Sequence, residues 1–172
     1  MNQFNVGGLT VTIYQDHHAE IPRNDSVAIC YRQSSRETLG TVAMCDSDLH
    51  KQELRFKLGE VYALPVFSYI HGSVQLSTTP FSCPWDSGRS GIAIASKRDF
   101  KDEAEAHRCI RSVIDEFNHY LNGDVWGYVI TDEGGCELGS CWGMYGSDYC
   151  KEEATAAASI LSKELATSTY SI

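Results

Sequence analysis

Two turn signals, each lying between two apolar runs, most constrain how this chain can fold. The first is His71-Gly72, which separates the apolar runs 61–70 and 73–78. The second is the segment 132–135 (DEGG), which separates 124–131 from 136–145. Glycine adopts the positive φ that tight hairpin turns require, so each pair of runs is predicted to form an antiparallel hairpin. Further strands are predicted at 9–14, 27–31, 41–45 and 91–96.

Two segments have the apolar spacing of helices that bury one face. Residues 102–121 place apolar side chains at intervals of three and four, and Asn122-Gly123 follows as a stop signal. The second helix, 147–166, begins with Ser147, a favourable N-cap residue. A short helix is predicted at 47–57, where the apolar spacing fits neither period cleanly.

Together these elements predict an α+β fold. Clustered strands with hairpin turns indicate a mainly antiparallel sheet, with the two main helices, about 102–121 and 147–166, packed on one face. The chain of 172 residues suits one domain, predicted over 1–166, with a frayed C-terminal tail at 167–172.

The composition indicates a soluble protein. No apolar stretch reaches the roughly 18 residues that a membrane-spanning helix needs. The N-terminus lacks the basic start and apolar block of a signal peptide, which predicts a cytoplasmic location and no membrane partner. Seven cysteines, an odd number, are more typical of free thiols in a reducing compartment than of disulfides.

The net charge of −9 is unevenly distributed. Residues 1–98 contain nine basic and nine acidic side chains, whereas residues 99–172 contain five basic and fourteen acidic ones, which leaves −9 in the C-terminal part. Because phosphates require basic grooves, direct nucleic-acid binding is disfavoured. Two interpretations stay open: an acidic face that competes for the basic channel of a nucleic-acid-binding protein, or a solvated surface that keeps the chain soluble.

The segment 80–91 (PFSCPWDSGRSG) concentrates reactive side chains between prolines and glycines. Cys83 is the one candidate nucleophile, but a catalytic thiol needs a histidine within hydrogen-bond reach. A strand over 73–78 would carry Cys83 roughly 20 Å from His71, unless the chain turns back at the prolines. We therefore predict no catalytic residue and a rigid turn, whose tip of Trp85, Asp86 and Ser87 is a candidate binding site.

A zinc site is the metal alternative. Cys136, Cys141 and Cys150, with Cys83, would supply four thiolates. Cys136 and Cys141 differ by an odd number, however, so a regular strand points them to opposite faces. The sequence also lacks the phosphate-binding, zincin and hydrolase motifs. No metal and no cofactor are predicted.

A second candidate binding group contains Trp142, Tyr145 and Asp148. Aromatic residues beside aspartates are compatible with a polar pocket or with rings that anchor helices to the sheet. The Cys-Trp pairing recurs in 82–85 and 140–142, which suggests that these two segments pack together.

Three motifs resemble those of a family of small proteins encoded by phages and mobile elements: 82–88 (SCPWDSG), 123–130 (GDVWGYVI) and 140–146 (SCWGMYG). The stretch 77–81 (STTPF) precedes the first motif as it does in that family. The segment 14–23 (YQDHHAEIPR) is similar to another of its segments, except that His17 and His18 stand where the family has acidic residues. The resemblance covers most of the chain outside the variable middle, 33–58.

This resemblance implies an acidic accessory protein that acts against host defences. The leading hypothesis is a counter-defence inhibitor of anti-CRISPR or anti-restriction type, which binds a host defence protein or complex in the host cytoplasm. The alternative is a small thiol-dependent or ligand-binding enzyme that uses the loop of Cys83, Trp85 and Asp86. A third interpretation is a virion assembly protein. The target and the oligomeric state stay open.

Overall fold

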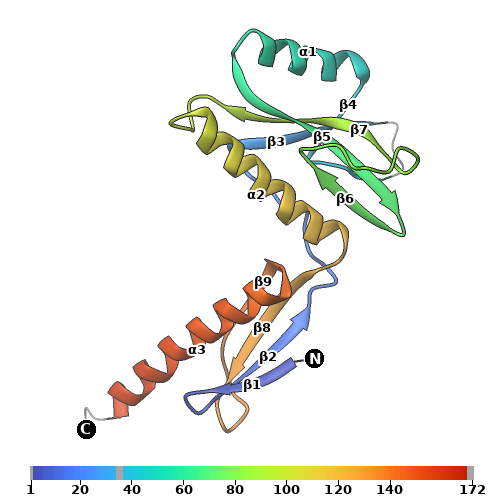
Figure 1. Ribbon diagram of the computed structural model, residues 1–172. Helices are drawn as coiled ribbons and strands as arrows, with labels where there is room; N and C mark the ends of the chain where they lie inside the picture. The colour runs from blue at the N-terminus through green and yellow to red at the C-terminus, as the bar shows by residue number, and fades with distance from the viewer. Residues whose placement is uncertain (1, 34–36, 170–172) are drawn as a thin grey trace. The chain divides into compact units, whose positions relative to one another are not determined.

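The computed structural model describes residues 2–33 and 37–169, which fold as an α+β protein. These residues form two sheets, mostly antiparallel, and three helices (Figure 1). The chain divides into two compact units. Unit 1 comprises the described parts of 1–20 and 123–172, and unit 2 comprises those of 21–122.

Unit 1 is a four-stranded antiparallel sheet that carries one helix. Its strands, in the order β1-β2-β8-β9, are β1 (Asn2–Val6), β2 (Leu9–Gln15), β8 (Val125–Thr131) and β9 (Glu137–Tyr145). Successive side chains of a strand point to opposite faces, so β2 buries Leu9, Val11 and Ile13 on one face. The helix α3 (Ser147–Thr169) packs there through the buried residues Cys150, Ala154 and Ala158, whose small side chains let it lie close to the strands.

Unit 2 has a five-stranded sheet. Its strands, in the order β4-β3-β7-β5-β6, are β3 (Val27–Arg32), β4 (Val42–Met44), β5 (Val61–His71), β6 (Ser73–Ser77) and β7 (Ser87–Ser96). β3 and β4 are parallel, and the other pairs are antiparallel. The hairpin predicted at His71-Gly72 is confirmed: Gly72 has a φ of 72° and joins β5 to β6.

The helix α2 (Glu103–Leu121) covers one face of the unit 2 sheet (Figure 1). Its predicted stripe is confirmed, and the buried members are Ala106, Ile110, Val113, Ile114 and Phe117. The helix begins at Asp102, whose side chain accepts a hydrogen bond from the Glu105 N–H at 2.8 Å. An aspartate in this position satisfies a backbone donor that the helix itself leaves unpaired.

The helix α1 (Asp46–Lys57) lies over the opposite face of the same sheet and packs loosely. None of its residues is buried. Leu49 contacts a small buried cluster formed by Cys30, Ala63 and Ile92. Because Cys30 and Ala63 are small and no side chain of α1 is fully buried, space remains between helix and sheet.

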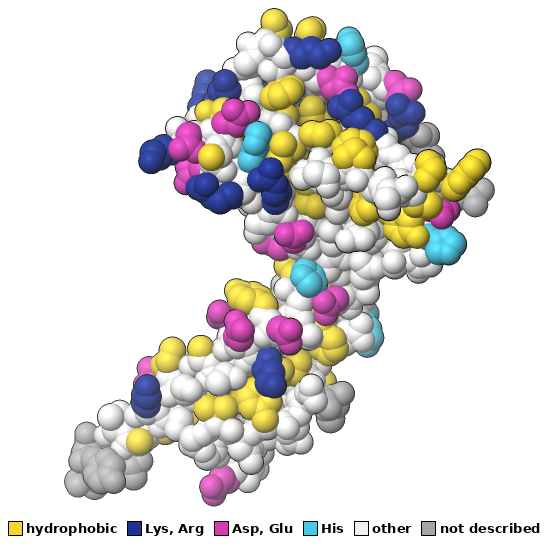
Figure 2. Space-filling view, viewed as in Figure 1, with side chains coloured by type: hydrophobic (Ala, Val, Ile, Leu, Met, Phe, Trp, Pro, Cys, Tyr) yellow, Lys and Arg dark blue, Asp and Glu magenta, His cyan; other side chains and the backbone are white. Residues whose placement is uncertain are grey.

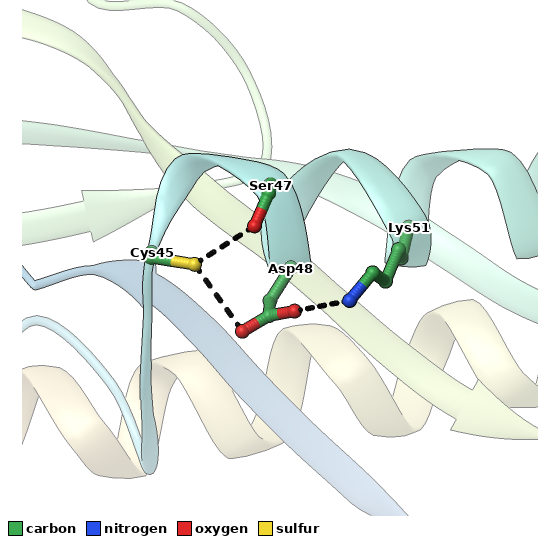
Figure 3. A network of polar contacts seen from close by, with 4 residues as sticks. All are labelled: Cys45, Ser47, Asp48 and Lys51. Atoms are coloured by element: carbon green, nitrogen blue, oxygen red, sulfur yellow. Dashed lines mark hydrogen bonds and ion pairs between the residues drawn. The ribbon is translucent and has the colours of Figure 1, made fainter.

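Side chains at the start of α1 form a small network of polar contacts (Figure 3). The N-cap residue is Cys45, whose thiol donates to Asp48 Oδ2 at 3.2 Å and lies 3.1 Å from Ser47 Oγ. Asp48 also accepts a hydrogen bond from Lys51 Nζ at 2.7 Å. Cys45 makes no side-chain hydrogen bond to the helix backbone, so α1 lacks the cap that Asp102 gives to α2.

The structure corrects the predicted layers. We expected both main helices on one face of one sheet, whereas α2 and α3 cover different sheets. The reason is that β2 pairs with β8, with Ile13 opposite Tyr128. These two strands are separated in the sequence by all the residues of unit 2. Local spacing does not reveal such a pairing. The strand β1 was not predicted because NQFNV is polar and largely exposed at the sheet edge.

The C-terminal helix is longer than predicted. α3 continues through Thr169, and residues 170–172 of the predicted tail lie outside the described residues. No helix in the described part of the chain is long and apolar enough to span a membrane.

Candidate binding site at the Trp85 loop

The Trp85 loop, residues 78–86, connects β6 to β7 and returns the chain to the end of β5. β7 pairs with β5 so that Ser87 lies opposite Tyr69. One residue earlier, the Asp86 carbonyl accepts a hydrogen bond from the Ile70 N–H at 2.8 Å. The ring of Phe81 packs against that of Tyr69, with the centroids 5.7 Å apart. The base of the loop is therefore held by backbone pairing and by ring packing.

Trp85 projects from this fixed base with 92% of its surface exposed. Pro80 and Pro84 restrict the backbone of the loop, because the proline ring holds its own φ at about −65°. Figure 2 shows apolar side chains projecting at the end of unit 2 where the β6–β7 loop of Figure 1 lies. A large ring in water contributes nothing to the core, but exposed tryptophans are frequent anchors of protein interfaces.

The structure corrects the expected separation of Cys83 from His71. The chain turns back at the loop, and Asp86 contacts both residues. Asp86 Oδ2 lies 3.4 Å from His71 Nδ1 and accepts a long hydrogen bond of 3.7 Å from the Cys83 thiol. The strand predicted over 73–78 is present as β6 and leads the chain away from His71. The chain then returns, because β7 pairs with β5 up to Tyr69 and so brings Asp86 and Cys83 back near His71.

The order of these three groups differs from that of a cysteine hydrolase. A catalytic thiol gives its proton to an imidazole, which a third group orients. Here the carboxylate of Asp86 lies between the thiol and the imidazole. The thiol contacts a carboxylate and not the imidazole that would have to accept its proton. The arrangement thus favours a structural role for Cys83, with His71 and Asp86 forming a polar edge beside Trp85.

Ser87 closes the loop. Its hydroxyl donates a hydrogen bond to the Cys83 carbonyl. Ser87 is also the first residue of β7. Ser87 thus links the start of β7 to the loop backbone, and Trp85 is the fully exposed side chain of the predicted tip.

The second predicted group lies in unit 1. Trp142 is 50% exposed and stacks on Tyr14, with the ring centroids 6.0 Å apart and the planes at 27°. A Cβ added at Gly127 would lie 2.4 Å from the indole, so glycine is required beneath it. Tyr145 donates its hydroxyl proton to the Glu20 carbonyl at 3.1 Å, and Asp148 lies in the first turn of α3. Trp142 thus presents half of its ring to solvent, whereas Tyr145 links the end of β9 to the backbone at Glu20.

The two predicted groups belong to different units. Trp85, Asp86 and Ser87 are in unit 2, whereas Trp142, Tyr145 and Asp148 are in unit 1. The packing of 82–85 against 140–142 stays a prediction.

The net charge also follows the units. The sequence of unit 1 contains ten acidic and two basic side chains, a net charge of −8. That of unit 2 contains thirteen acidic and twelve basic ones, a net charge of −1. The acidic field therefore belongs to the unit of Trp142, while the Trp85 loop belongs to a nearly neutral unit.

The seven cysteines are free thiols. Burial raises the pKa of Cys30 and of Cys150 to about 11, which disfavours the thiolate that metals and electrophiles require. Within residues 2–33 and 37–169, no three side chains of His, Cys, Asp or Glu gather closely enough to hold a metal ion.

Comparison with models of known protein families gives no match, and comparisons with curated proteins and with solved structures give none either. What the chain does must therefore be argued from its own residues.

Sequence reasoning missed two parts of this surface. It set His71 aside, although a hairpin followed by a proline-containing loop is a signal that the chain can return to the first strand. It also overlooked the ring contact that Phe81 makes with Tyr69 at the loop base. Neither partner is visible in local spacing, because both depend on the register of β7 against β5.

Proposed function

We propose that this chain is a counter-defence inhibitor, encoded by a phage or mobile element, that binds a host defence protein or complex of the CRISPR or restriction type. It acts by contact in the host cytoplasm. The observation that carries the proposal is Trp85, 92% exposed on a loop whose base is fixed. A rigid, exposed ring binds a partner without the entropic cost of ordering a mobile segment.

Two further features support the proposal. The motifs at 82–88 and 140–146, which resemble those of small phage and mobile-element proteins, supply the biological setting. The charge of −8 on unit 1 suits a partner with a basic surface, and defence complexes that hold nucleic acid have such surfaces.

The test compares phage plating on hosts that carry an active CRISPR or restriction system, with and without the chain. The wild-type chain is expected to restore plating and to co-purify with the defence complex. Trp85→Ala is expected to weaken that complex about 30-fold or more, the effect of losing an interface anchor of about 2 kcal/mol.

Two control variants make the result specific. Leu58→Ala removes another apolar side chain of unit 2, 66% exposed at the end of α1, and should leave binding unchanged. Cys83→Ala should also retain binding, whereas a thiol-dependent activity would vanish. The proposal fails if the wild-type chain neither rescues plating nor associates with a defence complex.

A further inference from the structure

A pocket lies under the C-terminal half of α1, away from the Trp85 loop. Its volume is about 440 Å³, within the range of small-molecule sites. Its apolar walls come from the helix and from the sheet: Phe56, Ala63, Leu64, Pro65 and Ile92. Figure 2 shows apolar side chains on the face of unit 2 below α1, with Lys and Arg side chains around them.

The pocket follows from the strand pairing. β6 pairs only with Phe67–His71, so the first half of β5 has β7 on one side and no described strand on the other. Pro65 lies in this half of β5 and has no N–H that would be left unpaired at such an edge. On the sheet face, the buried Ala63 is too small to fill the space below α1.

The polar members of the pocket wall are mostly basic. Arg89 donates to Glu53 Oε1 at 2.7 Å, and His107 lies 3.6 Å from Glu103. Lys57, in the last turn of α1, is exposed and forms no ion pair with the described residues. The carboxylate of Glu53 is thus already neutralised, and Lys57 is left as a cation beside an apolar space.

We propose that this pocket binds an amphipathic monocarboxylate, with its apolar chain against Phe56 and Leu64 and its carboxylate at Lys57. The apolar walls supply most of the affinity by removing the chain from water. The ammonium of Lys57 selects an anionic head group over a neutral or cationic one. This site is independent of partner binding at Trp85.

The probes are octanoate, octanol and octylammonium, which share a chain and differ in head group. Each is titrated into the isotope-labelled full chain and followed by the NMR shifts of Ala63, Leu64 and Ile92. Octanoate is expected to shift these signals at the lowest concentration and octylammonium at the highest. Added salt should reduce the preference for octanoate, because the charge pair is at the surface.

Two surface variants with matched controls test the assignment. Lys57→Gln should weaken octanoate binding about 2- to 5-fold and leave octanol binding unchanged, the effect of one exposed charge pair. Lys51→Gln, on the same helix but bound to Asp48, should change neither. Phe56→Ala should weaken both ligands, whereas Leu54→Ala, a similarly exposed residue outside the pocket wall, should weaken neither.

The proposal is overturned by any of three results. The first is that octanoate leaves the three pocket residues unshifted at millimolar concentration. The second is that octanol or octylammonium binds as tightly as octanoate. The third is that Lys57→Gln and Lys51→Gln behave alike.

Discussion

The seven thiols of this chain differ in burial, and Cys83 and Cys109 are half-buried. Cys45, Cys136 and Cys141 are exposed, whereas Cys30 and Cys150 are completely buried. Desolvation is the main cause that raises the pKa of both buried thiols to about 11. The buried thiols are therefore parts of the two cores, Cys30 in unit 2 and Cys150 in unit 1, rather than nucleophiles.

The raised pKa of Cys30 predicts a loss of stability in alkali. Unfolding lets the thiol ionise at its ordinary pKa of 9.0, while the folded state holds the proton up to about 11. The unfolded state therefore binds fewer protons between pH 9 and 11, and the free energy of unfolding falls as pH rises. Two pKa units correspond to about 3 kcal/mol. Urea unfolding of the full chain at pH 8, 9, 10 and 11 measures this fall.

The control for this prediction is Cys30→Ala. The variant loses stability at every pH because it leaves a small cavity, but its free energy of unfolding should depend less steeply on pH than that of the wild type. Equal slopes for the two proteins would contradict the role given to Cys30.

For single residues, the sequence indicated which side chains are candidates for a binding site. It did not indicate which of these side chains contact one another. Trp85 was correctly expected on a loop between two strands, because prolines and glycines act locally. The contact of Asp86 with His71 could not be predicted from the same residues. It depends on where β7 pairs with β5, and backbone register is set by the whole sheet.

The elements themselves follow closely from local patterns. The alternation of β2 and the stripe of α2 were predicted within one or two residues, since period and burial are linked within one segment. The N-terminal caps of the helices differ. The side chain of Asp102 accepts a backbone hydrogen bond at the start of α2, whereas Cys45 at the start of α1 makes no such bond.

This difference predicts opposite effects of two substitutions. Asp102→Ala should destabilise unit 2 by about 1 kcal/mol, because the Glu105 N–H loses its acceptor. Cys45→Ser should protect the first-turn amides of α1, because a hydroxyl at the N-cap accepts a backbone hydrogen bond better than a thiol. Hydrogen exchange of the two helices, with urea unfolding, measures both effects. Unchanged exchange in both variants would show that the caps are unimportant here.

At the scale of the whole molecule, each unit has its own sheet and its own core, with α3 in unit 1 and α1 and α2 in unit 2. The sequence predicted a single domain, because no proline- or glycine-rich linker separates the parts. The contact between β2 and β8, which brings the two ends of unit 1 together, has no local signal. The single domain over 1–166 stays a prediction, and composition does not show the division into two compact units at Glu20 and Gly123.

The two-unit arrangement predicts that residues 21–122 fold alone. The core around Ile110 and Phe117 lies wholly within this segment. The isolated segment should show a cooperative urea transition and the amide spectrum of unit 2 in the full chain. A disordered spectrum would mean that unit 2 depends on unit 1 and that the chain is one domain.

The interruption of unit 1 by unit 2 has a consequence for synthesis on the ribosome. The hairpin of β1 and β2 emerges before residues 21–122, and its partner β8 is translated only after them. At typical translation speeds this takes roughly 5 to 20 seconds. During that time Leu9, Val11 and Ile13 have neither β8 nor α3 to cover them, although unit 2 can already be complete. During that interval the nascent chain therefore exposes an apolar hairpin after unit 2 can have folded, and a chaperone that binds short apolar strands could bind this hairpin.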